Sequence, residues 1–273
     1  MARPLWKGAI SFGLVTIPVQ LFNATRRDEL RFRQLDRRDG SVVREKRVSE
    51  ASGREVPWED VVKGYEFEQG SFVVLDPEDF TSANVKASET IDIAQVVPRD
   101  SIPAEYFERP LFVVPARMGV KPYHLLREVL HHTGRAAVAT IVMHGRQHLA
   151  ALLADEQVIM LELLHFAHEI KGLDELDAGA ALEPPELTPK ELDLAEQLVS
   201  ALDGPWRPEE FHDDYRDDLL ALIEEKARTG RTPVREAEEA GGTAEVIDMM
   251  DLLKKSVGEA RRRKEKGQKR KAS

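Results

Sequence analysis

Short runs of β-branched and aromatic residues, separated by glycine and proline, fill roughly the first two-thirds of the chain. Residues 90–97 alternate apolar and polar side chains, which predicts a strand with one buried and one exposed face. Similar runs predict strands over 9–22, with a bulge or bend at its Gly and Pro, and over 70–75, 110–115, 136–143 and 158–164. A helix is predicted over 123–132, with Gly134 as its stop. Seven or so short strands with one inserted helix predict a barrel or a strongly curved sheet.

The last third of the chain is predicted to be helical. Residues 188–191 read Thr-Pro-Lys-Glu, a capping box with Pro at the first helical position, and they open a helix that ends at Gly204. Pro208 is predicted to start a second helix, with Gly230 after it. The expected fold class is therefore α+β, a barrel followed by helices.

Charge in this chain is sorted by position. Residues 1–54 carry twelve Lys and Arg against six Asp and Glu, and residues 254–273 carry ten against two. The chain between them holds seventeen against forty-one, and the formal net charge of the whole is −10. Two basic regions that flank an acidic middle segment favour a protein that binds a polyanion, such as nucleic acid, at particular sites on its surface. For either cluster alone, a simple solvated face is the alternative.

The first basic region predicts an extended β-arm that projects from the barrel. Residues 31–33 read Arg-Phe-Arg, which on a strand places both guanidinium groups on one face. Residues 36–40 predict a turn, and residues 42–48 a returning strand. The cations expected to contact phosphate here are Arg26, Arg27, Arg31, Arg33, Arg37, Arg38, Arg44, Lys46, Arg47, Arg54 and Lys63. They are not arranged to read base edges, so binding should be indifferent to sequence.

The second basic region is the tail. Its composition cannot support a core, so we expect it to be disordered when free and able to reach DNA. The cations expected to do so are Lys254, Lys255, Arg261, Arg262, Arg263, Lys264, Lys266, Lys269, Arg270 and Lys271.

Catalytic motifs are missing from the sequence: it has no G-x-x-x-x-G-K-[ST], G-x-G-x-x-G, G-x-S-x-G or H-E-x-x-H. His165 and His168 lack a third metal ligand at a recognised spacing, and the carboxylates of residues 213–218 are predicted to form a solvated helix face. We expect no enzyme activity, no metal and no cofactor. A metal-dependent nucleic-acid hydrolase that uses these His and Asp clusters is one alternative. A histone-like protein that coats DNA is another.

The composition also indicates the cellular compartment in which the protein is expected. The chain has no Cys, which excludes disulfides and thiolate metal sites and favours a reducing environment. Its N-terminus has no apolar stretch of signal-peptide length, and the apolar region 149–167 is interrupted by charges, so no membrane span is expected. We therefore expect a soluble, cytoplasmic protein.

Several separate segments resemble prokaryotic Ku proteins, in the right order over about residues 1–230. Residues 3–21 read RPLWKGAISFGLVTIPVQL, which closely resembles the opening of that family. The other matching segments are 62–67 (VKGYEF), 72–75 (FVVL), 123–128 (YHLLRE) with 133–134 (TG), 161–170 (LELLHFAHEI), and the two predicted helices after 188 and 208.

The resemblance implies a Ku core: a barrel whose β-arm, here about residues 22–63, bridges to a second copy so that a homodimer closes a ring around duplex DNA. It implies loading onto double-strand ends and recruitment of an ATP-dependent DNA ligase for non-homologous end joining, in association with the bacterial nucleoid. Carried to this chain, it divides the sequence into a core (1–180), a helical, ligase-contacting part (181–230), and a linker with basic tail (231–273). Some family members have C-x-x-C where residues 49–52 read Ser-Glu-Ala-Ser, so a zinc or redox site there is absent from this chain.

Overall fold

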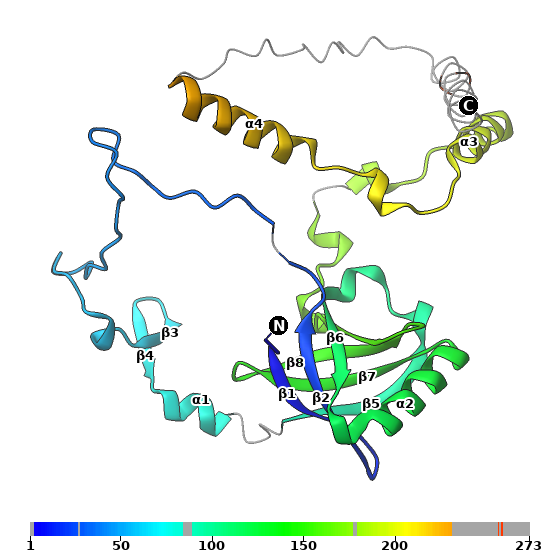
Figure 1. Ribbon diagram of the computed structural model, residues 1–273, viewed down its shortest axis with the longest axis horizontal. Coiled ribbons are helices and arrows are strands. Elements are labelled where there is room, and N and C mark those ends of the chain that lie inside the picture. The colour runs from blue at the N-terminus through cyan, green and yellow to red at the C-terminus, as the bar shows by residue number, and fades with distance from the viewer. Residues whose placement is uncertain are drawn as a thin grey trace. The chain divides into compact units, whose positions relative to one another are not determined.

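A closed seven-stranded barrel lies within the first of two compact units in this computed structural model (Figure 1). The structure describes residues 3–26, 28–83, 89–176 and 179–230, together with Ser256 and Gly258. Unit one spans Met1–Glu175 and unit two Leu176–Ser273. The predicted barrel and the helices that follow it in sequence are confirmed.

The barrel strands follow the order β1-β2-β6-β9-β8-β7-β5 and close where β5 pairs with β1. Neighbouring strands are antiparallel except at this closing pair, which is parallel. The strand bounds are β1 Trp6–Phe12, β2 Val15–Asn23, β5 Thr90–Pro98, β6 Phe107–Pro115, β7 Arg135–Met143, β8 Arg146–Ala154 and β9 Ile159–Leu164.

Alternating side chains fill the interior of the barrel. On β2, Ile17, Val19 and Leu21 are buried while their neighbours are partly exposed, as the period of two along a strand requires. The strand β8 differs because small residues such as Ala150, which pairs with Ala139 of β7, let residues 150–154 be buried on both faces. The continuous apolar run of β8 therefore lacks the alternation that marks β5, and it was not among the predicted strands.

The predicted helix after β6 is confirmed as α2 (Val120–Thr133), which contacts β7 and β8. Tyr123 and Leu130 enter the main core cluster from this helix. The Tyr123 hydroxyl donates to the Val113 carbonyl oxygen at 2.7 Å and accepts from the Ile159 amide at 2.8 Å. The phenol thus connects the end of β6 with the start of β9.

The single strand predicted over residues 9–22 is wrong, because the bend at Gly13 is a hairpin turn that separates two antiparallel strands, β1 and β2. Gly13 lies in the turn between β1 and β2 with φ 62°, a conformation that glycine adopts without a Cβ clash. Pro18 lies within β2 opposite Ala9, one residue before the pairing with β6 begins at Val19. The missing N–H of Pro18 therefore removes no bond from the β2–β6 ladder.

A separate two-stranded sheet, β3 (Lys63–Glu68) and β4 (Ser71–Leu75), lies between β2 and β5 in sequence, followed by α1 (Pro77–Ala83). The structure confirms the predicted strand over 70–75. Every described residue of β3 is exposed, and only Leu75 of β4 is partly buried.

The second unit contains α3 (Pro189–Leu202) and α4 (Asp214–Thr229). The capping box predicted for α3 is confirmed, because Thr188 N donates to Glu191 Oε2 at 2.7 Å and Glu191 N donates back to the Thr188 hydroxyl at 3.4 Å. The predicted start of the next helix at Pro208 is wrong. Pro208–Glu210 forms only a 3-10 turn, and α4 begins after Asp213, whose carboxylate accepts from Arg216 N at 3.0 Å.

Candidate nucleic-acid interface

The arm (residues 22–63) is extended and mostly irregular where the structure describes it. The regular strands predicted over 31–33 and 42–48 do not form. Two isolated bridges, Leu35 to Val42 and Val48 to Glu55, connect its segments instead. The turn predicted over 36–40 is confirmed by a 2.8 Å bond from Gly40 N to the Asp36 carbonyl oxygen. A lone pair of strands without a third strand or an apolar layer is marginal in water, which explains why propensity alone does not produce a ladder here.

Two predicted cations of the arm form exposed ion pairs. Arg38 Nη2 lies 2.6 Å from Asp36 Oδ2, and Lys46 Nζ lies 2.6 Å from Glu55 Oε2. The hydrogen bond from Arg38 holds the pKa of Asp36 below its usual value. Exposed pairs of this kind contribute little free energy, so phosphate oxygens can replace the carboxylates.

Two other predicted cations lie over aromatic rings. The Arg47 guanidinium is 4.4 Å from the centre of the Trp58 ring, and Lys63 Nζ is 4.8 Å from the centre of the Phe80 ring. In each contact the charged group itself lies over the ring, and an exposed contact of this kind adds only a modest attraction.

The remaining described cations of the predicted set are exposed arginines that form no ion pair with any residue in the described part of the chain. They are Arg26, Arg31, Arg33, Arg37, Arg44 and Arg54. Unpaired guanidinium groups present their full donor set to an incoming anion. Arg27 and all ten predicted tail cations lie outside the described residues.

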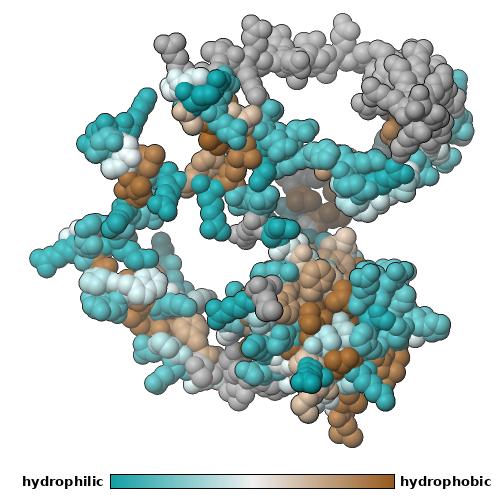
Figure 2. All heavy atoms as spheres, in the orientation of Figure 1, coloured by the Kyte–Doolittle hydropathy of each residue, from teal (hydrophilic) through white to brown (hydrophobic). Residues whose placement is uncertain are grey.

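Large apolar side chains are exposed along the same segment. Figure 2 shows brown hydrophobic atoms among the teal polar ones at the left of the view, where Figure 1 draws this segment in blue and cyan. Between 42% and 71% of each of these residues is accessible: Phe32, Leu35, Val42, Val43, Val48, Trp58, Val61 and Val62. The β3–β4 sheet adds Tyr65, Phe67, Phe72, Val73 and Val74, at 50–72%. So large an exposed apolar set is typical of a surface that another chain covers.

A hollow of about 760 Å³ lies at the end of the barrel where the arm begins. We call it the basic hollow; it is lined by Arg3, Phe22, Asn23, Thr25, Arg26, Glu108 and Arg109. Of its three arginines only Arg26 was predicted to bind phosphate. Arg3 and Arg109 carry no local sequence signal for this place, because only the pairing of β1, β2 and β6 brings them together.

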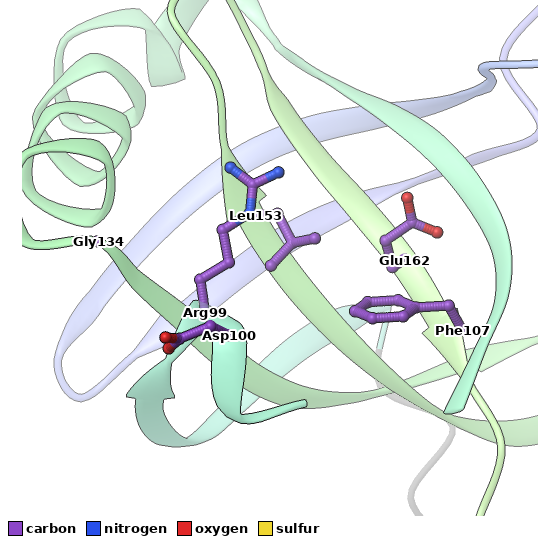
Figure 3. Close-up of a pocket in the computed structure, with 6 residues that line it drawn as sticks. All are labelled: Arg99, Asp100, Phe107, Gly134, Leu153 and Glu162. Carbon is purple, nitrogen blue, oxygen red and sulfur yellow. The ribbon is translucent and has the colours of Figure 1, made fainter. Parts of the chain in front are cut away.

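A second hollow, of about 580 Å³, lies on the outside of the barrel and is lined by Arg99, Asp100, Phe107, Gly134, Leu153 and Glu162. Figure 3 shows the Glu162 carboxylate beside the Phe107 ring, with Leu153 between it and Arg99 in the view. Burial raises the pKa of Glu162, and the positive charge of Arg99 opposes that shift. This hollow therefore holds one partly buried carboxylate, whose charge is disfavoured by burial and only partly stabilised by the positive charge of Arg99.

The histidine and aspartate clusters are not brought together into a ligand set. His165 Nδ1 lies 3.8 Å from Glu169 Oε2, and the His168 ring stacks on Phe166. Asp213 caps α4. Among the residues that the structure describes, no group of three or more His, Asp and Glu is placed to hold a metal ion. Within the same residues, no helix combines the length and the apolar character needed to cross a membrane.

The closed barrel, interrupted between β2 and β5 by an exposed, arginine-bearing excursion, defines a class of β-barrel protein that presents cations outside its core. A family model described as the Ku70/Ku80 beta-barrel domain matches residues 11–194. This chain belongs to the Ku family.

Bacterial relatives carry the similarity over nearly the whole chain. The non-homologous end joining protein Ku of Opitutus terrae is 44% identical over 257 residues, covering 94% of this chain and 92% of the relative. The protein of the same name from Coxiella burnetii is 41% identical, covering 96% and 97%. That of Pseudomonas aeruginosa is 42% identical, covering 94% and 88%. Among solved structures, the SPOC domain of human PHD-finger protein 3 aligns with a TM-score of only 0.29 at 11% identity over 59% of this chain, which is too low to support any inference.

Proposed function

We propose that this protein binds the ends of double-stranded DNA without regard to sequence and acts in non-homologous end joining, as the names of its relatives state for them. The observation that carries the proposal is the set of exposed arginines on the arm of a Ku-family barrel that form no ion pair with any residue the structure describes. Guanidinium groups on an extended, irregular segment contact phosphate oxygens, which are the same in every sequence. The protein works by binding alone, and removal of divalent ions with a chelator should leave its affinity for DNA unchanged.

The active form that we propose is a homodimer that closes a ring. Supporting this, the arm and the β3–β4 sheet expose a long apolar set, and a two-stranded sheet of this kind is marginal in isolation. A second copy related by a two-fold axis would cover both segments with their own counterparts. Light scattering at micromolar concentration without DNA should give the mass of a dimer, and a stable monomer would contradict the proposal.

The experiment that tests end binding compares two competitors of equal mass. A preformed ring threads onto a linear duplex but not onto a covalently closed circle, whatever the charge density of the circle. In an electrophoretic shift assay, unlabelled linear DNA should displace a labelled linear duplex, and closed circles should not. Equal competition by both would refute a threaded ring and favour the histone-like coating mode.

The helical unit is the proposed docking surface for an ATP-dependent ligase. Its helices and the turn between them expose apolar side chains: Val199 and Leu202 are 70% and 69% accessible, and Trp206, Phe211 and Tyr215 are 72–77% accessible. A double substitution of Val199 and Leu202 to Glu should abolish stimulation of the purified ligase while binding of DNA ends is retained. Unchanged stimulation would move the ligase contact elsewhere in the chain.

A further inference from the structure

The basic hollow is assembled by the order of the barrel strands. Because β2 is antiparallel to both β1 and β6, the start of β1, the end of β2 and the start of β6 meet at one end of the barrel (Figure 1). Arg3 precedes β1, Arg26 follows β2, and Arg109 lies near the start of β6. Backbone bonds from Leu5 N to Leu21 O at 2.8 Å and from Ala24 N to Pro110 O at 3.3 Å connect these strand ends.

The charges of the hollow are unbalanced. Three guanidinium groups face one carboxylate, that of Glu108, and none of Arg3, Arg26 and Arg109 forms an ion pair within the described part of the chain. Arg109 is half-buried and donates to the Asn23 side-chain oxygen, so its guanidinium is held in place while donors remain free.

We propose that the basic hollow binds a phosphate group of the DNA at the point where the arm leaves the barrel, with Arg3 and Arg109 as its principal donors. This assignment rests on the DNA binding proposed above, and it adds two residues that lie outside the arm. A guanidinium group binds a phosphate through two parallel N–H donors. Here three arginines from separate chain segments surround one position, which arginines on a single flexible segment could not do. The half-buried Phe22 gives the hollow an apolar wall on which a sugar can pack.

The test measures the affinity of full-length protein for a short linear duplex by fluorescence anisotropy. Replacing Arg3 and Arg109 together by Gln removes two donors, and loss of hydrogen bonds to a charged group should weaken binding by about tenfold or more. It should also lower the slope of log K against log salt by about 0.9, because the variant neutralises one phosphate fewer than the wild type. The matched control is the double substitution of Arg117 and Lys121 to Gln, which removes the same charge beyond the opposite end of β6.

The one carboxylate that lines the hollow, that of Glu108, gives a control with the opposite expected effect on duplex affinity. Glu108→Gln removes the one negative charge of the hollow and should tighten binding of the duplex, whereas a purely structural role for this cluster predicts no gain. Arg3 is exposed, so Arg3→Gln alone should weaken binding without altering the melting temperature, and this single variant keeps the test valid if the Arg109 substitution unfolds the chain. Equal affinities of the Arg3 variant and the wild type would overturn the proposal.

Two duplexes separate the sources of the phosphate. If the double variant loses affinity only for a 5′-phosphorylated duplex, the hollow holds the terminal phosphate, and if it loses affinity equally for a 5′-hydroxyl duplex, the hollow holds a backbone phosphodiester. A loss no greater than that of the Arg117 and Lys121 control on both duplexes would refute the site.

A probe without DNA distinguishes failure of the site from failure of the proposed function. Inorganic pyrophosphate at millimolar concentration should raise the melting temperature of the wild type and not that of the Arg3 and Arg109 double variant. If the wild type does not bind linear duplex at all, end binding is wrong. If the wild type binds linear duplex, but the double variant binds it equally well and pyrophosphate does not raise the melting temperature, only the phosphate site is wrong.

Discussion

The Tyr123 hydroxyl connects two strands of the barrel from a buried position. The residue is 2% exposed, and its oxygen donates to Val113 O and accepts from Ile159 N at 2.7 and 2.8 Å. Burial raises the pKa of this phenol, so it stays protonated and able to donate. Tyr123→Phe removes both bonds and leaves a backbone carbonyl and an amide without a partner. At about 1–3 kcal/mol for each of these two groups, we expect a loss of about 2–6 kcal/mol in the free energy of unfolding.

Urea unfolding followed by tryptophan fluorescence measures this loss if only the barrel tryptophan remains. Trp6 is partly buried and donates to Val142 O at 3.1 Å, whereas Trp58 and Trp206 are 71% and 77% exposed and can be replaced by Phe. In that background Tyr123→Phe should also lower the melting temperature by about 4–24 °C, at ~2–4 °C per kcal/mol for a unit of this size.

The matched control is Tyr106→Phe. Tyr106 is half-buried, and its hydroxyl forms no hydrogen bond with any residue that the structure describes. Tyr106→Phe should therefore change the free energy of unfolding by no more than about 0.5 kcal/mol. A Tyr123 variant as stable as the Tyr106 variant would refute the reasoning, because it would mean that water or a shift of the strands satisfies the two backbone groups.

Three further changes test the charges. Reversing Arg31 and Arg33 to Glu should abolish binding of DNA ends while light scattering still gives a folded dimer; retained end binding would move the DNA contact off the arm. Truncation after Leu253 should lower the slope of log K against log salt by about 3–4 if about four tail cations contact phosphates at ~0.9 each, with the preference for ends kept, whereas an unchanged slope would show that the tail does not contact DNA. Glu162→Gln should raise the melting temperature at pH 7 and lose this advantage toward pH 4. Between the usual glutamate pKa and the raised pKa of Glu162 the folded chain binds a proton that the unfolded chain has released, so stability falls as pH rises through this window, and a variant with no pH-dependent difference would contradict it.

Local sequence signals predicted the elements whose cause is itself local. The alternation over residues 90–97 predicted β5, and the Thr188 capping box predicted the start of α3. Gly134 was predicted to end α2, and it does so with φ 60°, where a side chain would be strained.

What the sequence does not reveal depends on tertiary partners. β8 lacks alternation because both faces of its second half are buried. Residues 42–48, which begin and end with valine, form no strand because no described segment pairs with their whole length. The candidate site divides in the same way. Runs of arginine marked the arm, whereas the proximity of Arg3 and Arg109 follows from strand order, which no spacing in the sequence encodes.

The parallel pairing of β1 with β5 has a consequence for the covalent chain. The chain leaves the barrel after β2 and returns at β5, and the β1–β2 hairpin is held between β5 on one side and β6 on the other. A protease that cuts the chain once between β2 and β5 therefore produces two fragments that both contain barrel strands. The nicked protein should migrate as one species under native conditions and separate only on denaturation. The same arrangement means that the β1–β2 hairpin could be removed as one peptide, and the barrel that remains would have two unpaired edges, one at β5 and one at β6.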